Sequence, residues 1–343
     1  MLDDALLRVL AAHAGRPQAF AQPPTPVSGG FWAAIYSFEL EQPPTDLAGP
    51  LILRVMPNQR SAEVETIVHR GMAKQGYPTP CIVLDGFDDA LGGAFMVMEW
   101  VEGAPPLGGR RIGGTLFTLS KTLRRIARQL GVASAQLHDL DPQPIVDSLE
   151  AAGIDPRALG PESLLAEIRT AAGSTGADFD ALLAWLEQRR PSFAPAVVCH
   201  GDIHPFNILV TDDDSFNVLD WTNGSLCRRE YDVGCTAALL QCAPIVVPRI
   251  ARGALRAVTG SLSHRFVNIY RKLAPPINLD VVEWFETLQY ARCLAAVAMA
   301  PLDDPIIGVK HPFRLAAPAM IHQVRMITDV MIELPAGVEL DAP

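Results

Sequence analysis

The sequence predicts an α+β protein in which a small antiparallel-sheet lobe precedes a larger helical lobe. In the first hundred residues, runs rich in β-branched and aromatic residues alternate with turns that contain glycine and proline. After Trp100, apolar residues recur at helical spacing over long stretches. The chain contains no internal repeat or heptad pattern, which excludes solenoids and coiled coils. We therefore expect an N-terminal lobe at residues 1–100 and a C-terminal lobe at residues 101–343.

The elements of each lobe follow from these patterns. In the first lobe we expect strands at 31–40, 51–56, 81–87 and 94–99 and a helix at 61–74. In the second lobe we expect helices near 116–138, 161–172, 177–189, 246–258, 280–299 and 315–333, with short strands at 196–199 and 216–219.

Charge and hydropathy exclude several classes of protein. The 343 residues include 28 lysines and arginines against 38 aspartates and glutamates, a net charge of −10. Such a surface disfavours nucleic-acid binding and polybasic membrane attachment. The longest apolar stretch, residues 236–248, is interrupted by proline and falls short of the ~20 residues that span a bilayer. We expect a soluble, cytoplasmic protein with no nucleic-acid partner and no membrane span, and its oligomeric state stays open.

The six cysteines do not form a recognisable framework. They are spread over the whole chain, and no C-x-x-C pair occurs among them. A disulfide scaffold or a structural zinc site needs a closer spacing. We expect buried or reduced thiols.

The most informative segment is residues 197–221, VVCHGDIHPFNILVTDDDSFNVLDW. A strand-like run leads to Asp202, Asn207 follows five residues later, and Asp220 ends the next strand-like run. The spacing Asp-x-x-x-x-Asn matches the catalytic loop of protein kinases, in which the aspartate accepts the hydroxyl proton and the asparagine binds magnesium. Phosphoryl transfer requires hard oxygen ligands for Mg²⁺ and a carboxylate that orients the attacking hydroxyl, and two carboxylates with one amide can supply both. A single aspartate at a strand end is usually a turn residue or a helix cap, but the three together favour this chemistry.

Two other groups in this segment have a simpler interpretation. His200 and His204 have no metal-ligating company nearby in the sequence, so we expect them to hydrogen-bond the loop backbone. The three consecutive aspartates at 212–214 are expected to form a solvated hairpin turn.

The motif H-G-D-I-H-P-F-N, followed by Asp220-Trp221, resembles the aminoglycoside phosphotransferase and choline kinase-like family. The resemblance covers most of the chain and implies a protein-kinase-like bilobal fold that binds ATP and Mg²⁺. It implies that Asp202 is the catalytic base and that Asn207 and Asp220 ligate magnesium. The segment 229–234 resembles the family's following segment, in which Asp232 supports the catalytic loop.

The N-terminal lobe supplies the candidate nucleotide-binding residues. Ser28, Gly29 and Gly30 lie at the first hairpin, where kinases close a glycine-containing loop over the phosphates. A kinase also needs a cation on the next strand and a helix carboxylate to hold it. The strand offers Arg54 rather than lysine. The helix offers Glu63 and Glu65, and Glu65 is preferred because its place, eleven residues before Gly76, resembles that of the family's helix glutamate. An arginine in place of the lysine resembles the pattern of a branch related to the kinase-like domains of acyl-CoA dehydrogenase fusion proteins.

Residues 96–101 form the predicted hinge strand. There the backbone of Glu99, Trp100 and Val101 would meet the adenine and Met98 would line its pocket, although a plain core strand fits the methionines equally well. Thr222 follows the Asp-Trp pair at a position where many relatives carry an acid.

The acceptor is predicted only by class. Basic and acidic residues after Trp221 are nearly balanced in number, whereas a polycationic sugar needs uncompensated carboxylates. We expect a small-molecule hydroxyl acceptor other than a strongly polycationic sugar, with Glu286 and Arg292 as candidate acceptor-site groups. Trp284, Phe285, Tyr290 and Met299 are expected to be mostly core, and those that remain exposed would suit an apolar or amphipathic alcohol. The alternative is a nucleotide-binding pseudokinase or regulatory module without transferase activity, and Arg54 is the feature that favours it.

Overall fold

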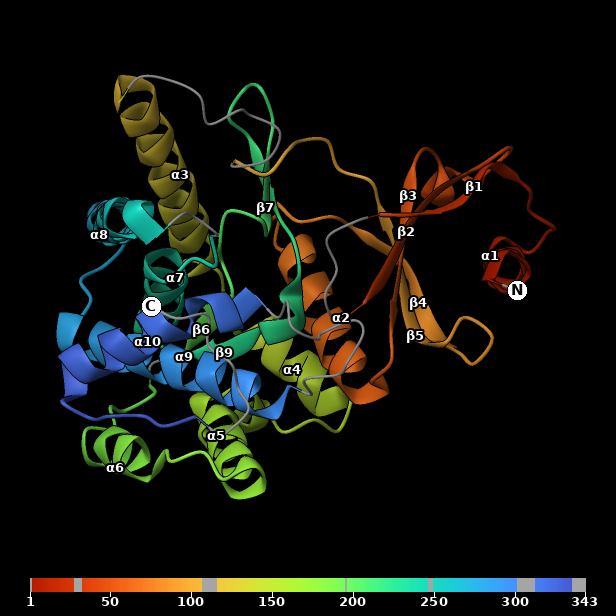
Figure 1. Cartoon of the computed structure of the whole chain (residues 1–343). Helices are drawn as coiled ribbons and strands as arrows, with labels where there is room; N and C mark the ends of the chain where they lie inside the picture. Colours follow the sequence, from red (N-terminus) through yellow and green to blue (C-terminus); the bar gives the residue numbers. More distant parts are fainter. Residues whose placement is uncertain are drawn as a thin grey trace. The chain divides into compact units, whose positions relative to one another are not determined.

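The computed structural model has the α+β composition that the sequence predicts, with a five-stranded antiparallel sheet and long helices (Figure 1). It describes residues 2–27, 33–106, 116–194, 196–245, 249–300 and 312–334. Among the helices so described, none is both long and apolar enough to cross a membrane.

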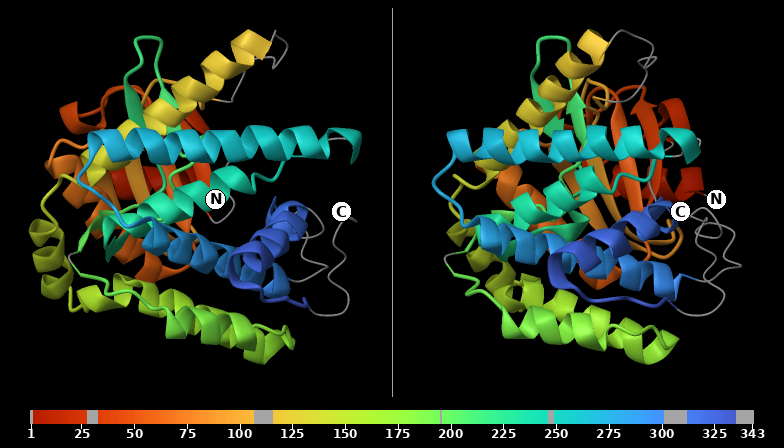
Figure 2. Two further views of the ribbon diagram at one scale, coloured as in Figure 1. Left: turned by 90° about the vertical axis from the view of Figure 1, so that its left-hand side faces the viewer. Right: turned by 60° about the vertical axis from the view of Figure 1, so that its left-hand side comes forward.

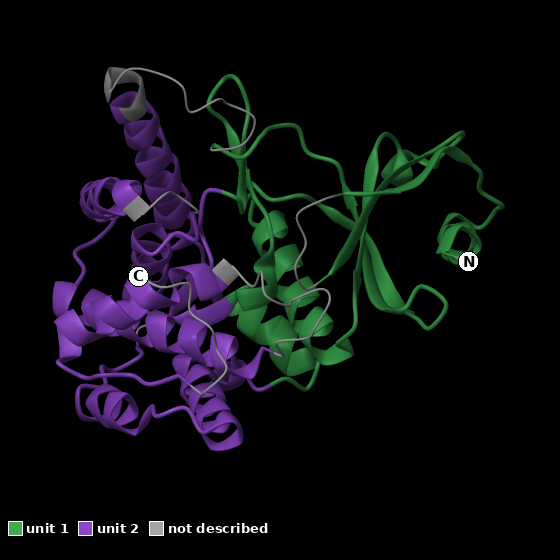
Figure 3. Cartoon of the chain, in the orientation of Figure 1, with its two compact units in different colours: residues 1–108, 143–154, 206–224 green, residues 109–142, 155–205, 225–343 purple. Residues whose placement is uncertain are grey.

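The chain forms two compact units, coloured separately in Figure 3. The first unit combines Met1–Gly108, Gln143–Ile154 and Phe206–Gly224, and the second combines Gly109–Pro142, Asp155–Pro205 and Ser225–Pro343. The division into lobes at 1–100 and 101–343 stays a prediction.

The sheet of the first unit has the strand order β1-β2-β3-β5-β4, with every neighbouring pair antiparallel. Its strands are β1 (Phe20–Pro26), β2 (Ala34–Leu40), β3 (Leu51–Met56), β4 (Ile82–Asp88) and β5 (Gly93–Glu99). The sequence patterns located all of them except β1, whose seven residues include three prolines. An edge strand tolerates proline because one row of its backbone groups is unpaired, and β1 lies at the edge.

The alternation of side chains along β3 determines where Arg54 points. Leu53 and Val55 face the core that includes α1 (Leu2–Ala14), whereas Met56 packs with Ala62 of α2 (Gln59–Lys74). Since successive side chains of a strand point to opposite faces, Arg54 lies on the α2 side of the sheet. Helix α2 begins at the cap Asn58, whose side chain accepts a hydrogen bond from the Ser61 backbone N–H at 3.0 Å.

Two later segments of the chain complete this unit. Helix α4 (Gln143–Ala151) packs against α2, where a Cβ on Gly71 would lie 2.5 Å from Ile145. The strands β7 (Ile208–Val210) and β8 (Phe216–Val218) form a hairpin whose turn contains the three aspartates, as predicted. Three hydrogen bonds to Asp213 from Thr211 and Ser215 lower the pKa of Asp213 to about 2. The short 3-10 turn η3 (Trp221–Asn223) follows β8 and lies against α2.

The second unit is built around the central helix α9 (Leu279–Met299), most of which is buried. The core gathers side chains from α5, α6, α7, α9 and α10, and α3 and α8 cross each other (Figure 2). Its other elements are α3 (Leu116–Leu137), α5 (Pro161–Thr175), α6 (Asp180–Gln188), β6 (Val197–Cys199), β9 (Ser225–Cys227), α7 (Arg229–Gln241), η4 (Arg249–Ala251), α8 (Arg252–Leu273) and α10 (Pro312–Thr328), together with η2 (Pro156–Leu159). In the first unit, η1 (Thr45–Leu47) precedes β3.

The helix predicted at 246–258 is wrong in extent. Residues 246–248 lie outside the described part of the chain, and α8 starts at Arg252 and continues to Leu273. The thiols agree with the prediction of reduced cysteines, since all six are free and five are buried.

Candidate functional site

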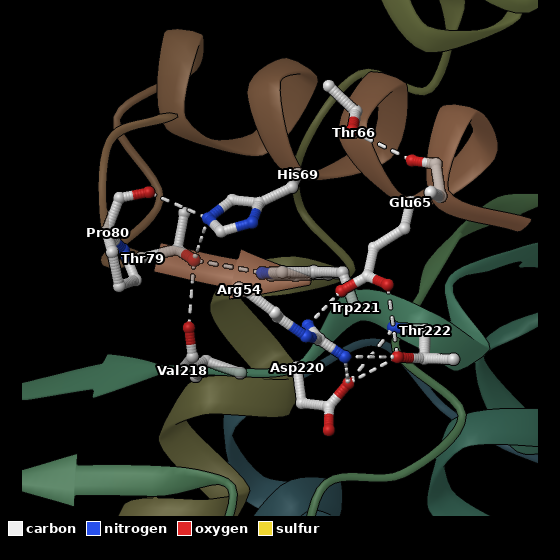
Figure 4. A network of polar contacts seen from close by, with 11 residues as sticks. Arg54, Glu65, Thr66, His69, Thr79, Pro80, Val218, Asp220, Trp221 and Thr222 are labelled. Atoms are coloured by element: carbon white, nitrogen blue, oxygen red, sulfur yellow. Dashed lines mark hydrogen bonds and ion pairs between the residues drawn. The ribbon is translucent and has the colours of Figure 1, made fainter. Parts of the chain in front are cut away.

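The candidate site of the first unit is centred on Arg54, which β3 places against α2. The side chain is buried, with 7% of the residue exposed, and its Nη1 donates a hydrogen bond to Oε1 of Glu65, itself 2% exposed. Glu63 pairs instead with Arg60 at the surface. The predicted strand–helix ion pair is therefore present, with the predicted glutamate (Figure 4).

Arg54 has a second acidic partner. Its Nη2 donates to Oδ1 of Asp220 at 3.0 Å and to the Thr222 hydroxyl at 2.8 Å. The Thr222 hydroxyl lies 2.5 Å from Asp220 Oδ1 and 3.1 Å from Glu65 Oε2, so its single proton can go to either acid. One guanidinium and one hydroxyl thus join two carboxylates that come from α2 and from the end of β8.

The electrostatics of this cluster follow from its burial. Burial, with a contribution from the nearby Asp220, raises the pKa of Glu65 to about 7 against the lowering effect of Arg54. Burial alone would lower the pKa of Arg54, but Glu65 and Asp220 outweigh it and raise that pKa. Arg54 is therefore always charged, and it is the cation that makes the buried carboxylate of Glu65 tolerable.

Asp220 has an unusual backbone. It adopts φ 65° and ψ 78°, in the left-handed region that non-glycine residues seldom occupy, and it caps η3. Its side chain is 39% exposed, in contrast to the two buried partners. Such outliers concentrate at functional sites, because the surrounding structure must hold them.

Asn207 lies across the hairpin from Asp220. It directly precedes β7, and its carbonyl accepts the Leu219 backbone N–H at 2.9 Å. An amide and a part-exposed carboxylate offer hard oxygen donors of the kind that magnesium prefers. The two residues predicted as metal ligands therefore flank the same hairpin of the first unit, Asn207 just before β7 and Asp220 shortly after β8.

A second polar network flanks the cluster (Figure 4). The indole N–H of Trp221 donates to the Thr79 hydroxyl at 2.9 Å, and that hydroxyl donates to the Val218 carbonyl at 2.8 Å. Nε2 of His69 lies 3.0 Å from the same hydroxyl and 2.7 Å from the Pro80 carbonyl. The sequence analysis did not single out Thr79 or His69, because a threonine between two prolines and a histidine within an amphipathic helix carry no motif.

The predicted hinge residues lie at the end of β5 and just after it. Met98 and Glu99 end the strand, and the Glu99 carboxylate accepts the Cys81 backbone N–H at 2.9 Å. The backbone N–H of Glu99 donates to the Cys81 carbonyl and that of Trp100 donates to the Pro50 carbonyl, each at 3.1 Å. Ser28, Gly29 and Gly30 lie outside the described residues.

Asp202 belongs to the second unit, where a network of buried groups supports its loop. The Asp232 carboxylate accepts the backbone N–H groups of His200 at 3.0 Å and Gly201 at 2.6 Å, as the resemblance implied. The ring of His138 bridges the Asp232 carboxylate, 3.1 Å from Nε2, and the Tyr270 hydroxyl, 2.7 Å from Nδ1. Burial would raise the pKa of Asp232, but His138 and the loop N–H groups lower it instead.

The histidines of this loop are engaged with its backbone and with Asp202. Nδ1 of the buried His200 accepts the Asp202 backbone N–H at 3.3 Å, and Nε2 of His204 lies 3.8 Å from the Asp202 carboxylate. The side chains of Asp202 and His204 are about one-quarter exposed, so the predicted base is accessible to solvent.

His138, Cys199 and Asp232 lie close enough together to resemble a metal site. The Cys199 thiol lies against the backbone carbonyls of Val197, Cys227 and Arg228, at 3.9, 3.6 and 3.7 Å. His138 and Asp232 already bond each other and the loop. We interpret this cluster as structural.

The acceptor-site candidates lie on α9. Burial, with a contribution from Glu283, raises the pKa of Glu286 to about 7. Arg292 is near Tyr231 and Asp202, which raise its pKa against the effect of burial. Trp284, Phe285 and Tyr290 are core residues, as predicted, whereas Met299 is 52% exposed.

The second unit also contains a cavity of about 880 Å³ between α6, α9 and α10. Charged residues of both signs line it, and none of the predicted site residues does. Its size alone therefore does not make it the acceptor site. Its polar lining comprises Arg189, Asp280, Glu283, His322, Arg325, Thr328 and Asp329.

The structure is similar to those of several known phosphotransferases. A provisionally assigned aminoglycoside phosphotransferase from Ralstonia eutropha JMP134 superposes with a TM-score of 0.64 at 16% identity, over 95% of this chain and 97% of that one. Spectinomycin phosphotransferase, crystallised with ADP and spectinomycin, gives a TM-score of 0.59 at 13% identity, with coverages of 95% and 98%. A type I macrolide 2′-phosphotransferase gives 0.59 at 16% identity, with coverages of 92% and 96%. At these identities the likeness establishes the protein-kinase-like fold.

Fold and sequence together define the class of protein. No curated protein matches the chain in sequence. The model of the phosphotransferase enzyme family matches residues 25–274, which include Arg54, Glu65, Asp202, Asn207 and Asp220. The chain belongs to the phosphotransferase enzyme family. The narrower resemblance to the acyl-CoA dehydrogenase fusion branch stays a prediction.

Proposed function

We propose that the protein transfers the γ-phosphoryl group of ATP to a hydroxyl group of a small molecule in a Mg²⁺-dependent reaction. The observation that carries this proposal is the cluster of Arg54, Glu65 and Asp220, which holds a phosphate-binding cation beside a part-exposed carboxylate. Little covalent chemistry is needed for this reaction, so the placement of charge is the main task of the protein.

Each residue has a defined task in this scheme. Asp202 accepts the proton of the acceptor hydroxyl and orients its oxygen toward the phosphorus. Arg54, held by Glu65, binds the phosphates of the nucleotide, while Asn207 and Asp220 would hold Mg²⁺. When bound, the metal neutralises charge on the phosphates.

The adenine is assigned to Met98, Glu99, Trp100 and Val101. Because the N–H groups of Glu99 and Trp100 already donate within the unit, the base would use the Glu99 carbonyl and the Val101 backbone. Ser28, Gly29 and Gly30 would cover the phosphates through their backbone N–H groups.

The acceptor is proposed to be an alcohol other than a strongly polycationic sugar. The nearly balanced charge of the chain after Trp221 supports this choice. Similar structures include phosphotransferases named for aminoglycosides, spectinomycin and macrolides, and one was crystallised with hygromycin B, so the fold itself does not select one acceptor.

A pseudokinase is the second candidate, because Arg54 occupies Asp220 Oδ1 and Thr222 is not an acid. The test is Mg²⁺-dependent ATP turnover with pools of aminoglycosides, macrolides, choline-like amines and hydroxylated lipids or acyl thioesters. Turnover that one pool stimulates and that Asp202→Asn abolishes without loss of folding supports the transferase. Tight ATP binding without stimulation by any pool favours the pseudokinase, and activity that survives in Asp202→Asn contradicts the assigned base.

A further inference from the structure

We propose that Thr79 is a positioning residue of the nucleotide site. Its hydroxyl holds the backbone on both sides of Asp220 and thereby sets the place of the Asp220 carboxylate for cation binding. The inference rests on the proposed function, in which Asp220 is a magnesium ligand.

The contacts of Thr79 leave little choice of hydrogen-bond direction. The hydroxyl has one proton, and the Val218 carbonyl at 2.8 Å can only accept it. The indole N–H of Trp221 can only donate, and it points to the hydroxyl at 2.9 Å. His69 must then carry a proton on Nε2, because that atom faces both the Pro80 carbonyl at 2.7 Å and the hydroxyl at 3.0 Å.

The position of these contacts in the chain is what links them to Asp220. Val218 lies two residues before Asp220 and Trp221 directly after it. The Thr79 hydroxyl therefore hydrogen-bonds the chain on both sides of Asp220 (Figure 4). The Val218 backbone N–H also donates to the Pro78 carbonyl at 2.8 Å, which brings the loop before β4 against the same turn. Asp220 itself has φ 65°, so the backbone turns at this residue, between the two residues that the Thr79 hydroxyl contacts.

The hydrogen bonds of Thr79 are buried. Thr79 is 6%, His69 2% and Trp221 1% exposed, so water does not compete for the hydrogen bonds. The rings of Tyr77 and Trp221 pack edge to face, with centroids 5.6 Å apart. The network is therefore a rigid support rather than a surface contact.

Helix α2 connects this support to the charged cluster. Glu65 and His69 stand four residues apart, and positions i and i+4 share one face of a helix. From that face Glu65 bonds Arg54, while His69 reaches the turn through Thr79. The position of Asp220 relative to Arg54 is thus set twice from α2, once through the guanidinium and once through the Thr79 hydroxyl.

The decisive variant is Thr79→Val, which removes the hydroxyl and keeps the shape. We expect the Mg²⁺ concentration that half-saturates ADP binding, measured by calorimetry, to rise about tenfold, as is typical when a residue behind a metal ligand is lost. ADP affinity without Mg²⁺ should change less than twofold. Thr79→Ser, which keeps the hydroxyl, should behave as wild type.

Thr66→Val is the matched control. Thr66 is equally buried on α2, but its hydroxyl donates to the Ala62 carbonyl of its own helix at 2.8 Å. We expect it to lower the urea midpoint of unfolding without moving the Mg²⁺ dependence. Should Thr79→Val fail to fold, Trp221→Phe removes the indole donor on one side of the turn and should shift the Mg²⁺ dependence in the same direction.

The outcomes separate the two proposals. If Thr79→Val or Trp221→Phe loses stability while Mg²⁺-dependent ADP binding stays as in wild type, Thr79 is only structural and the inference is overturned. If wild type binds ADP with no dependence on Mg²⁺, the proposed metal site fails, and the inference falls with it.

Discussion

Nη2 of Arg54 lies 3.0 Å from Oδ1 of Asp220, a carboxylate 166 residues further along the chain. The same guanidinium donates to Glu65, so a single buried cation serves two acids. A lysine would place one compact charge there, whereas the planar fork of arginine can address both acids at once. The replacement of lysine by arginine is therefore matched by the structure around it.

Replacing Arg54 alone should lower the free energy of unfolding, whereas replacing Arg54 and Glu65 together should change it much less. Arg54→Met leaves Glu65 buried without its partner, and we expect a loss of about 3 kcal/mol in the free energy of unfolding, measured in urea. Arg54→Met combined with Glu65→Leu should recover most of this loss, although nucleotide binding stays lost. A double variant as unstable as the single one would show that packing rather than charge accounts for the effect.

The half-buried carboxylate of Glu286 on α9 predicts a pH dependence of stability. Glu286 has a pKa of about 7 in the folded protein against an ordinary 4.5, so the folded state retains a proton that the unfolded state has released between these values. Its contribution is fully present below pH 4.5 and is lost as the pH rises to about 7. A shift of this size corresponds to at most ~3 kcal/mol.

Glu286→Gln should therefore be more stable than wild type at pH 8 by about 1–3 kcal/mol, with the difference vanishing near pH 4. Chemical denaturation across this pH range measures it. Glu283→Gln is the control, because Glu283 is exposed and its removal should leave most of the pH dependence in place. Parallel pH profiles of Glu286→Gln and wild type would contradict the assignment.

Asp232, which supports the Asp202 loop, predicts a pH dependence of stability opposite in sign to that of Glu286. The pKa of Asp232 is lowered, so its contribution is present above the ordinary value of 3.8 and is lost as the pH falls below it. Asp232→Asn should lose about 3 kcal/mol at pH 7, because the loop N–H groups would face an amide. The gap to wild type should shrink as the pH falls below 4. A constant gap at all pH values would mean that the charge of Asp232 is unimportant.

Alanine substitution of two helical glycines should change the stability of the protein in opposite directions. A Cβ on Gly234 would lie 2.7 Å from Cβ of Phe285 where α7 meets α9, so Gly234→Ala should cost about 1–3 kcal/mol. A Cβ on Gly260 of α8 would meet nothing within 4 Å, and Gly260→Ala should stabilise by about 1 kcal/mol. Thermal unfolding of both variants tests the packing. Equal effects would contradict the close approach of α7 to α9.

Local patterns carried most of what the sequence could predict. Strand β3 follows from a local β-rich run. The pairing of Arg54 with Glu65 was predicted from the resemblance to the family, in which a strand cation is held by a helix glutamate. Asp202, Asn207 and Asp220 follow from a spacing within a single segment. Strand β1 was not predicted, because prolines disfavour strands and are tolerated here only at the edge of the sheet.

Hydrogen bonds between residues far apart in the sequence could not be predicted from local patterns. Thr79 bonds Trp221 across 142 residues, and no local preference of a threonine between two prolines indicates this. The same holds for His138, whose partners Asp232 and Tyr270 lie 94 and 132 residues away. Such pairs are set by the tertiary fold, to which periodicity and propensity are blind.

The three-part composition of the first unit has a consequence for synthesis on the ribosome. Asp220 leaves the ribosome 166 residues after Arg54, a delay of roughly ten to thirty seconds at typical elongation rates. During that interval the nascent sheet can hold Arg54 and Glu65 together, but it lacks the third member of the cluster and the indole that caps Thr79. Translation arrested before residue 220 should therefore yield chains that never bind nucleotide with magnesium, however well their sheet has formed.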